Sequence, residues 1–159
     1  MIIETVMDDA VPAVADNRDS LQTALIEWAG MRGYKLPYDL FGAGDHGINP
    51  DVVLSFPALR LVFVGDAKPA TDLPSGDSGR VFRNYIRRFA ELLSLGHIDG
   101  GRLAIATNTQ VSSATWQEFL RVAISSEIAG KKSAEAPTVK IHETDSAGAH
   151  AWIVFCKIY

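Results

Sequence analysis

The stretch Pro50-Asp-Val-Val-Leu-Ser-Phe-Pro-Ala-Leu-Arg-Leu-Val-Phe-Val-Gly-Asp-Ala-Lys68 contains two apolar runs, 50–55 and 59–68, joined by Phe56-Pro57-Ala58. Proline at the second position of a short link favours a tight turn, so we expect the two runs to form an antiparallel hairpin. Both faces of the second run are mostly apolar, which is typical of a central strand covered on both sides. The hairpin therefore predicts a layered α/β domain.

The segments around this hairpin fit the same fold class. Apolar residues at helical spacing predict helices at 20–32, 78–95 and 115–128, and apolar runs predict strands at 36–41, 102–107, 138–143 and 149–159. The last two strands are expected to form a closing hairpin. The order predicts one three-layer α/β domain with a mixed sheet, in which 1–19 form an N-terminal arm, 20–107 the core, and 108–159 a C-terminal helix and β-hairpin.

Composition and charge narrow the function classes. The net charge of −4 argues against a protein that coats nucleic acid by bulk charge, although it leaves room for a local basic groove. Cys156 is the only cysteine, which excludes an internal disulfide and any Cys-rich metal site and predicts a cytoplasmic location. No apolar run approaches the roughly twenty residues that cross a bilayer, so we expect no membrane partner.

Two acidic residues and one lysine interrupt the apolar pattern of the hairpin. Side chains alternate along a strand, so Asp66 and Lys68 share one face. If the turn is centred on residues 57–58, Asp51 lies opposite Val64, one diagonal step from Asp66. A register shifted by two residues would keep the three side chains together, whereas a shift by one would separate them.

Buried charges of this kind are costly unless they are compensated, and a hard cation compensates two carboxylates. Asp oxygens are good ligands for Mg²⁺, which keeps several waters and also takes substrate phosphate oxygens. Lys68 beside such an ion could orient an attacking water, help to deprotonate it, or stabilise the transition state. The sequence leaves these three roles of Lys68 open.

Pro50-Asp51, fourteen further residues, and then Asp66-Ala67-Lys68 resemble the PD-(D/E)XK motif of restriction-endonuclease-like nucleases. That superfamily includes type II restriction enzymes, Holliday-junction resolvases and mismatch-repair nicking enzymes, and its core is an α-β-β-β-α-β unit. The resemblance implies that Asp51 and Asp66 bind Mg²⁺ or Mn²⁺, that Lys68 is the catalytic lysine, and that the substrate is nucleic acid, with DNA expected. It also suggests two further ligands, the carbonyl of Ala67 and the carboxylate of Glu27 on the first helix.

The helix expected after the motif is basic. Four arginines fall within nine residues with no acid among them. Arg80, Arg87 and either Arg83 or Asn84 share one helical face. We expect the whole group to bind the phosphate backbone: Arg80, Arg83, Asn84, Arg87 and Arg88. The alternative is a solvated basic face. The Q-x-x-x-Y pattern of RecB-like nucleases is not matched, although Tyr85 lies close to the expected position.

Other interpretations remain open at the level of sequence. Asp66 and Lys68 could form a salt bridge at an exposed hairpin end, and Glu27 could be an ordinary exposed helix acid. The spacing of Gly42, Gly44 and Gly47 spells GxGxxG, but a proline-led strand follows where a dinucleotide motif requires a helix. The whole chain could be an inactive nuclease-fold module for nucleic-acid binding or assembly, or an unrelated small-molecule enzyme. Dimerisation is expected by analogy alone.

Overall fold

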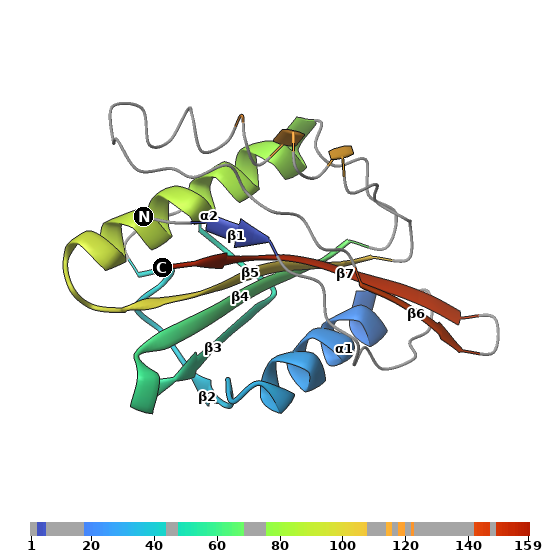
Figure 1. Cartoon of the computed structure of the whole chain (residues 1–159), viewed down its shortest axis with the longest axis horizontal. Coiled ribbons are helices and arrows are strands. Elements are labelled where there is room, and N and C mark those ends of the chain that lie inside the picture. Colours follow the sequence, from blue (N-terminus) through green and yellow to red (C-terminus); the bar gives the residue numbers. More distant parts are fainter. Residues whose placement is uncertain are drawn as a thin grey trace.

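A mixed seven-stranded sheet runs through the described part of the molecule, with one long helix on each face (Figure 1). The computed structural model describes residues 3–5, 18–43, 48–68, 76–107, 114–115, 118–119, 122, 142–146 and 149–159. The elements are β1 (Ile3–Thr5), α1 (Arg18–Met31), β2 (Leu36–Pro37), β3 (Val52–Phe56), a 3-10 turn (Pro57–Leu59), β4 (Leu61–Lys68), α2 (Gly76–Ser94), β5 (Gly100–Thr107), β6 (His142–Ser146) and β7 (Ala149–Ile158).

The strand order is β1-β7-β5-β4-β3-β2, and β6 pairs with β7 outside this path. β3 is antiparallel to β2 and β4, β4 is parallel to β5, and β7 is antiparallel to β5. Two parallel neighbours need a long crossover, which the chain between β4 and β5 supplies with α2. These findings confirm the expected α/β class and the mixed sheet.

The alternation of side chains along β4 divides the core into two layers. Phe63 and Ala67 belong to the layer under α1, together with Leu25 and Trp28 of that helix. Val62 and Val64 belong to the layer under α2, whose apolar stripe is Phe82, Tyr85, Ile86, Phe89 and Leu92. Six consecutive residues of β4, from Val62 to Ala67, are buried, as expected for a central strand covered on both sides.

Two glycines allow close approaches that fix this packing. A Cβ at Gly101 would lie 1.9 Å from the backbone oxygen of Val62, so only glycine lets β5 approach β4 at this point. Gly33 has a φ of +95°, and a Cβ there would lie 2.1 Å from the ring of Phe56. Glycine therefore ends α1 and lets the chain pass close against the end of β3.

The register of the β3–β4 hairpin differs from the expected one by two residues. Val52 pairs with Gly65, so Asp51 lies next to Asp66 and not opposite Val64. The link is a tight turn, as expected, but it is a 3-10 turn over Pro57–Leu59, and Arg60 ends it in the left-handed conformation with a φ of 56°. Because the shift is by an even number, each side chain keeps its face.

Several predicted boundaries change at the edges of the sheet. Ile3–Thr5, within the expected N-terminal arm, form a strand that pairs with β7. The strand expected at 36–41 is reduced to Leu36–Pro37, and the closing hairpin pairs β7 with His142–Ser146. Residues 115, 118–119 and 122 of the helix expected at 115–128 are helical, as is residue 114 just before it, and the rest of the expected helix lies outside the described residues. Within the described part, no helix is long and apolar enough to cross a membrane.

Candidate active site

Asp51 and Asp66 meet at the end of the β3–β4 hairpin that lies away from its turn. The backbone N–H of Asp51 donates to Oδ1 of Asp66 at 3.0 Å. In return, the backbone N–H of Ala67 donates to Oδ2 of Asp51 at 2.8 Å. Each carboxylate is thus held by a backbone group beside the other one, and this reciprocal arrangement fixes both acidic side chains next to each other.

Asp66 is buried beneath α2, with 3% of its surface exposed. The hydroxyl of Tyr85 on α2 lies 3.1 Å from Oδ2 and 3.3 Å from Oδ1 of Asp66, and it is the donor because the carboxylate only accepts. Burial raises the pKa of Asp66, and the nearby Asp51 carboxylate raises it further. The hydrogen bond from the Asp51 N–H, the charge of Lys68 and the Tyr85 hydroxyl act in the opposite direction on this pKa.

Tyr85 is a site residue that the sequence interpretation did not assign. Its position within the apolar stripe of α2 concealed its role, because a tyrosine at that spacing is usually a core residue. A usable signal was present, since a buried tyrosine hydroxyl normally finds a hydrogen-bond partner. Burial raises the pKa of Tyr85, and the charge of Asp66 raises it further, so the hydroxyl stays protonated at any physiological pH.

Lys68 ends β4 on the same face as Asp66 and is partly buried. Its positive charge is close enough to Asp66 to lower the pKa of that carboxyl group. Asp66 itself lies under α2 and is hydrogen-bonded to Tyr85, a setting different from an exposed hairpin end. The structure therefore brings Asp51, Asp66 and Lys68 to one end of one hairpin, on one face of the sheet.

Glu27 is not brought to this cluster. It is an exposed residue of α1, and α1 packs on the face of the sheet that Phe63 and Ala67 occupy. Asp66 points to the opposite face, toward Tyr85 of α2. Among the described residues, no group of three or more His, Cys, Asp or Glu side chains is placed where it could hold a metal ion.

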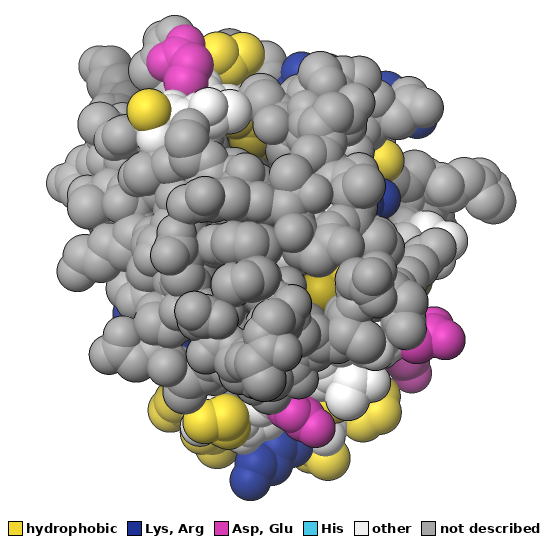
Figure 2. All heavy atoms as spheres, turned by 90° about the vertical axis from the view of Figure 1, so that its right-hand side faces the viewer, with side chains coloured by type: hydrophobic (Ala, Val, Ile, Leu, Met, Phe, Trp, Pro, Cys, Tyr) yellow, Lys and Arg dark blue, Asp and Glu magenta, His cyan; other side chains and the backbone are white. Residues whose placement is uncertain are grey.

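The basic residues of α2 divide into two kinds. Arg80 is exposed, and Arg83, Asn84 and Arg87 are partly exposed on the side of the helix away from its apolar stripe. The Nε of Arg87 lies 3.9 Å from Oε1 of Glu91. On the face shown in Figure 2, the described Lys and Arg side chains lie in separate places among acidic and hydrophobic ones.

Arg88 forms hydrogen bonds to other parts of the protein. Its Nε donates to the carbonyl of Phe41 and its Nη2 to that of Leu40, both at 2.7 Å. Its Nη1 also contacts Oε2 of Glu91 at 3.1 Å, and only 13% of the side chain is exposed. Arg88 therefore joins α2 to the segment that leads toward β3, and its donors are directed at protein carbonyls.

The donor chemistry of the aspartate pair fits a hard divalent cation. Mg²⁺ is commonly bound through one or two protein carboxylates, with water and substrate phosphate in the other positions, so a third carboxylate is not required. The Asp51 carboxylate raises the cost of ionising Asp66, and a cation between the two would remove that cost. The carbonyl of Ala67, adjacent in sequence to Asp66, is the third oxygen that the motif would supply.

Comparisons with protein-family models, with curated proteins and with solved structures gave no match to this chain.

Proposed function

We propose that this chain is a metal-dependent nuclease that hydrolyses phosphodiester bonds, with DNA as its substrate and Mg²⁺ or Mn²⁺ as its cofactor. The observation that carries the proposal is the convergence of Asp51 and Asp66, joined by reciprocal hydrogen bonds of 3.0 and 2.8 Å, with Lys68 on the same face. The order α1-β2-β3-β4-α2-β5 supports it, because it is the α-β-β-β-α-β order of the family that the motif resembles.

Each residue of the site would have a separate role in hydrolysis. A divalent ion would acidify a bound water and neutralise charge on the phosphate. Asp51 and Asp66 would hold that ion, and the hydrogen bond from Tyr85 would keep the Asp66 carboxylate in a fixed orientation. Lys68 would donate to the attacking water or to the non-bridging phosphate oxygen, where an ammonium group stabilises developing negative charge. Arg80, Arg83 and Arg87 would contact the backbone on either side of the cleaved bond.

The test is cleavage of linear, supercoiled, branched and single-stranded DNA in Mg²⁺, Mn²⁺ or EDTA. We expect divalent-dependent cleavage that Asp66→Asn and Lys68→Gln each reduce by about 10²–10⁴-fold, the usual effect of removing a group that acts on the reacting atoms. Glu27→Gln is the control, because Glu27 lies on the other face of the sheet, and it should cleave at the wild-type rate. Cleavage that persists in EDTA, or in Asp66→Asn, would refute the mechanism.

A binding module without activity is the second candidate. It is favoured by one observation: Asp66 already has hydrogen-bond partners in Tyr85 and in the Asp51 backbone, so the cluster is satisfied as a structural element. Under this alternative, DNA binds and is not cut with any metal ion, and Lys68→Gln does not change the affinity for DNA. The cleavage assay, run together with a binding assay on the same DNA, separates the two functions.

A further inference from the structure

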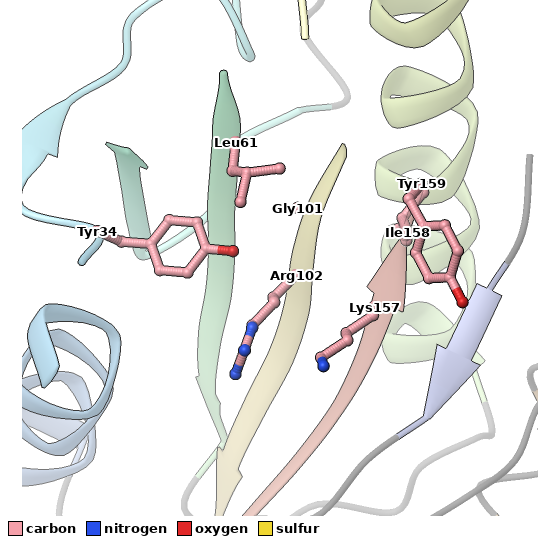
Figure 3. A pocket seen from close by; sticks show the side chains of 7 residues that line it. All are labelled: Tyr34, Leu61, Gly101, Arg102, Lys157, Ile158 and Tyr159. Atoms are coloured by element: carbon pink, nitrogen blue, oxygen red, sulfur yellow. The ribbon is translucent and has the colours of Figure 1, made fainter. Parts of the chain in front are cut away.

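A cavity of about 210 Å³ opens at the other end of the sheet, where β4 and β5 begin and β7 ends (Figure 3). Its lining residues are Tyr34, Leu61, Gly101, Arg102, Lys157, Ile158 and Tyr159. Tyr34 and Leu61 belong to the α1 side of the sheet. From Leu61 to Asp66 the strand advances five residues, about 16 Å at 3.3 Å per residue, so this cavity is separate from the aspartate pair.

Two basic side chains lie next to each other in this cavity. Arg102 of β5 and Lys157 of β7 are direct partners in the antiparallel register. They therefore project from the same face of the sheet, and in Figure 3 both side chains extend in the same direction. Like charges placed directly opposite each other on neighbouring strands repel, and a bound anion would turn this repulsion into attraction.

The groups around Arg102 hold its guanidinium in place. Its Cζ lies 5.5 Å from the ring centre of Trp28 and 5.3 Å from that of Phe155, distances at which a cation is attracted to an aromatic face. Burial raises the pKa of the Tyr34 hydroxyl, and the Arg102 guanidinium acts in the opposite direction on this pKa, so the two groups lie close together. A fixed guanidinium loses little conformational freedom when a ligand binds, which favours binding at this position.

The size and lining of the cavity limit the ligand class. Sites for drug-sized ligands are about 300–1,000 Å³, so this smaller cavity suits the oxyanion group of a ligand whose remaining part lies outside it. Guanidinium groups match the geometry of phosphate oxygens, and an ammonium group adds a point charge. We propose that Arg102, Lys157 and Tyr34 form a binding site for a phosphate monoester, on the opposite face of the sheet from the proposed nuclease site.

A phosphate monoester could belong to a free small molecule or to the 5′ end of a nucleic acid. Calorimetric titrations of the whole chain with inorganic phosphate, a nucleoside 5′-monophosphate, and short oligonucleotides with and without a 5′-phosphate would distinguish the sources. We expect saturable binding of the monophosphate. A preference for the 5′-phosphorylated oligonucleotide over its hydroxyl form would assign the site to nucleic-acid ends, whereas binding of the mononucleotide alone would assign it to a small molecule.

Variants of Lys157 test the site without disturbing the aromatic packing around Arg102. Lys157→Gln should weaken monophosphate binding at least tenfold, Lys157→Arg should restore it, and Lys35→Gln, an exposed lysine outside the cavity, should leave it unchanged. The proposal is overturned if no probe binds saturably, or if Lys157→Gln binds as tightly as the wild type. Because the readout is binding and not cleavage, its failure is distinguishable from failure of the nuclease proposal.

Discussion

Asp66 shows how a single buried acid can be unfavourable for stability and still be suited to a site. Only 3% of it is exposed, and burial is the largest cause of its raised pKa. A raised pKa means that the folded state holds the proton more tightly than the unfolded chain does. The stability that this provides is fully present below the unfolded pKa of about 3.9 and is lost as the pH rises through the folded pKa. At neutral pH, above the unfolded pKa, the burial of this acidic group therefore costs the fold stability.

The raised pKa of Asp66 predicts that Asp66→Asn stabilises the metal-free protein at pH 7. Asparagine keeps an oxygen that can accept from the Asp51 N–H and from Tyr85, and it removes the buried charge. We expect a gain of about 0.5–2 kcal/mol in the free energy of unfolding, the usual range for stabilising single substitutions. Urea denaturation in EDTA should show this gain at pH 7 and its disappearance near pH 3.

The matched control is Asp39→Asn, because Asp39 is exposed, and it should change the stability by less than about 0.5 kcal/mol. Addition of Mg²⁺ should raise the stability of the wild type but not that of Asp66→Asn, since only the native wild type would bind the ion. A lower stability of Asp66→Asn at pH 7 in EDTA would show that the ionised carboxylate is compensated without a cation.

At the scale of the elements, the sequence predicted which face each residue of the hairpin occupies but not its register. Alternation along residues 61–68 was sufficient to place Asp66 and Lys68 together. The register depends on the turn, and the left-handed conformation of Arg60 has no sequence signature comparable to glycine at such a position. The sequence therefore predicted that Asp51 and Asp66 share a face, but it placed Asp51 two residues away from its actual position along β4.

The basic face of α2 shows a second limit of prediction from the sequence. A helical pattern identifies residues that share a face, but it does not say which of them reach another segment of the chain. Arg88 lies near the apolar stripe and bonds to the carbonyls of Leu40 and Phe41, which are 48 and 47 residues away in sequence. Such long-range contacts depend on the fold, and no local spacing indicates them.

We predict that Arg88 and Arg83 respond differently to substitution by glutamine. Arg88→Gln removes two charge-assisted hydrogen bonds to backbone carbonyls, and it should lower the free energy of unfolding by roughly 2–3 kcal/mol. Arg83→Gln should change stability by less than about 0.5 kcal/mol but weaken DNA binding, measured by fluorescence anisotropy at low salt. Equal effects of the two substitutions on stability would contradict this division of roles.

At the scale of the whole molecule, the sequence established the class and the layers, whereas it did not show how the two ends of the chain meet. β7 lies between β5 and β1, so the C-terminal strand is interior and the N-terminal segment forms the edge. The three-residue strand β1 is too short for a periodic signal, and its pairing partner is more than 150 residues away. The apolar run of β7 did predict burial, and Cys156 lies within it with no exposed surface.

Cys156 therefore provides a probe of global opening. Burial raises the pKa of its thiol to about 12, so the reactive thiolate is scarce, and the residue is paired with Leu103 on one side and Thr5 on the other. A domain that is stable by about 5 kcal/mol or more opens globally in fewer than one molecule in ~10³. Labelling of the native protein by a disulfide reagent should thus be at least about 10³-fold slower than labelling of the denatured chain, and it should accelerate with urea in parallel with unfolding.

Ser94→Cys in a Cys156→Ala background is the accessible control, because Ser94 is exposed, and it should react at the denatured rate throughout. Rapid labelling of Cys156 without urea would mean that β1 and β7 separate locally while the rest of the sheet stays folded.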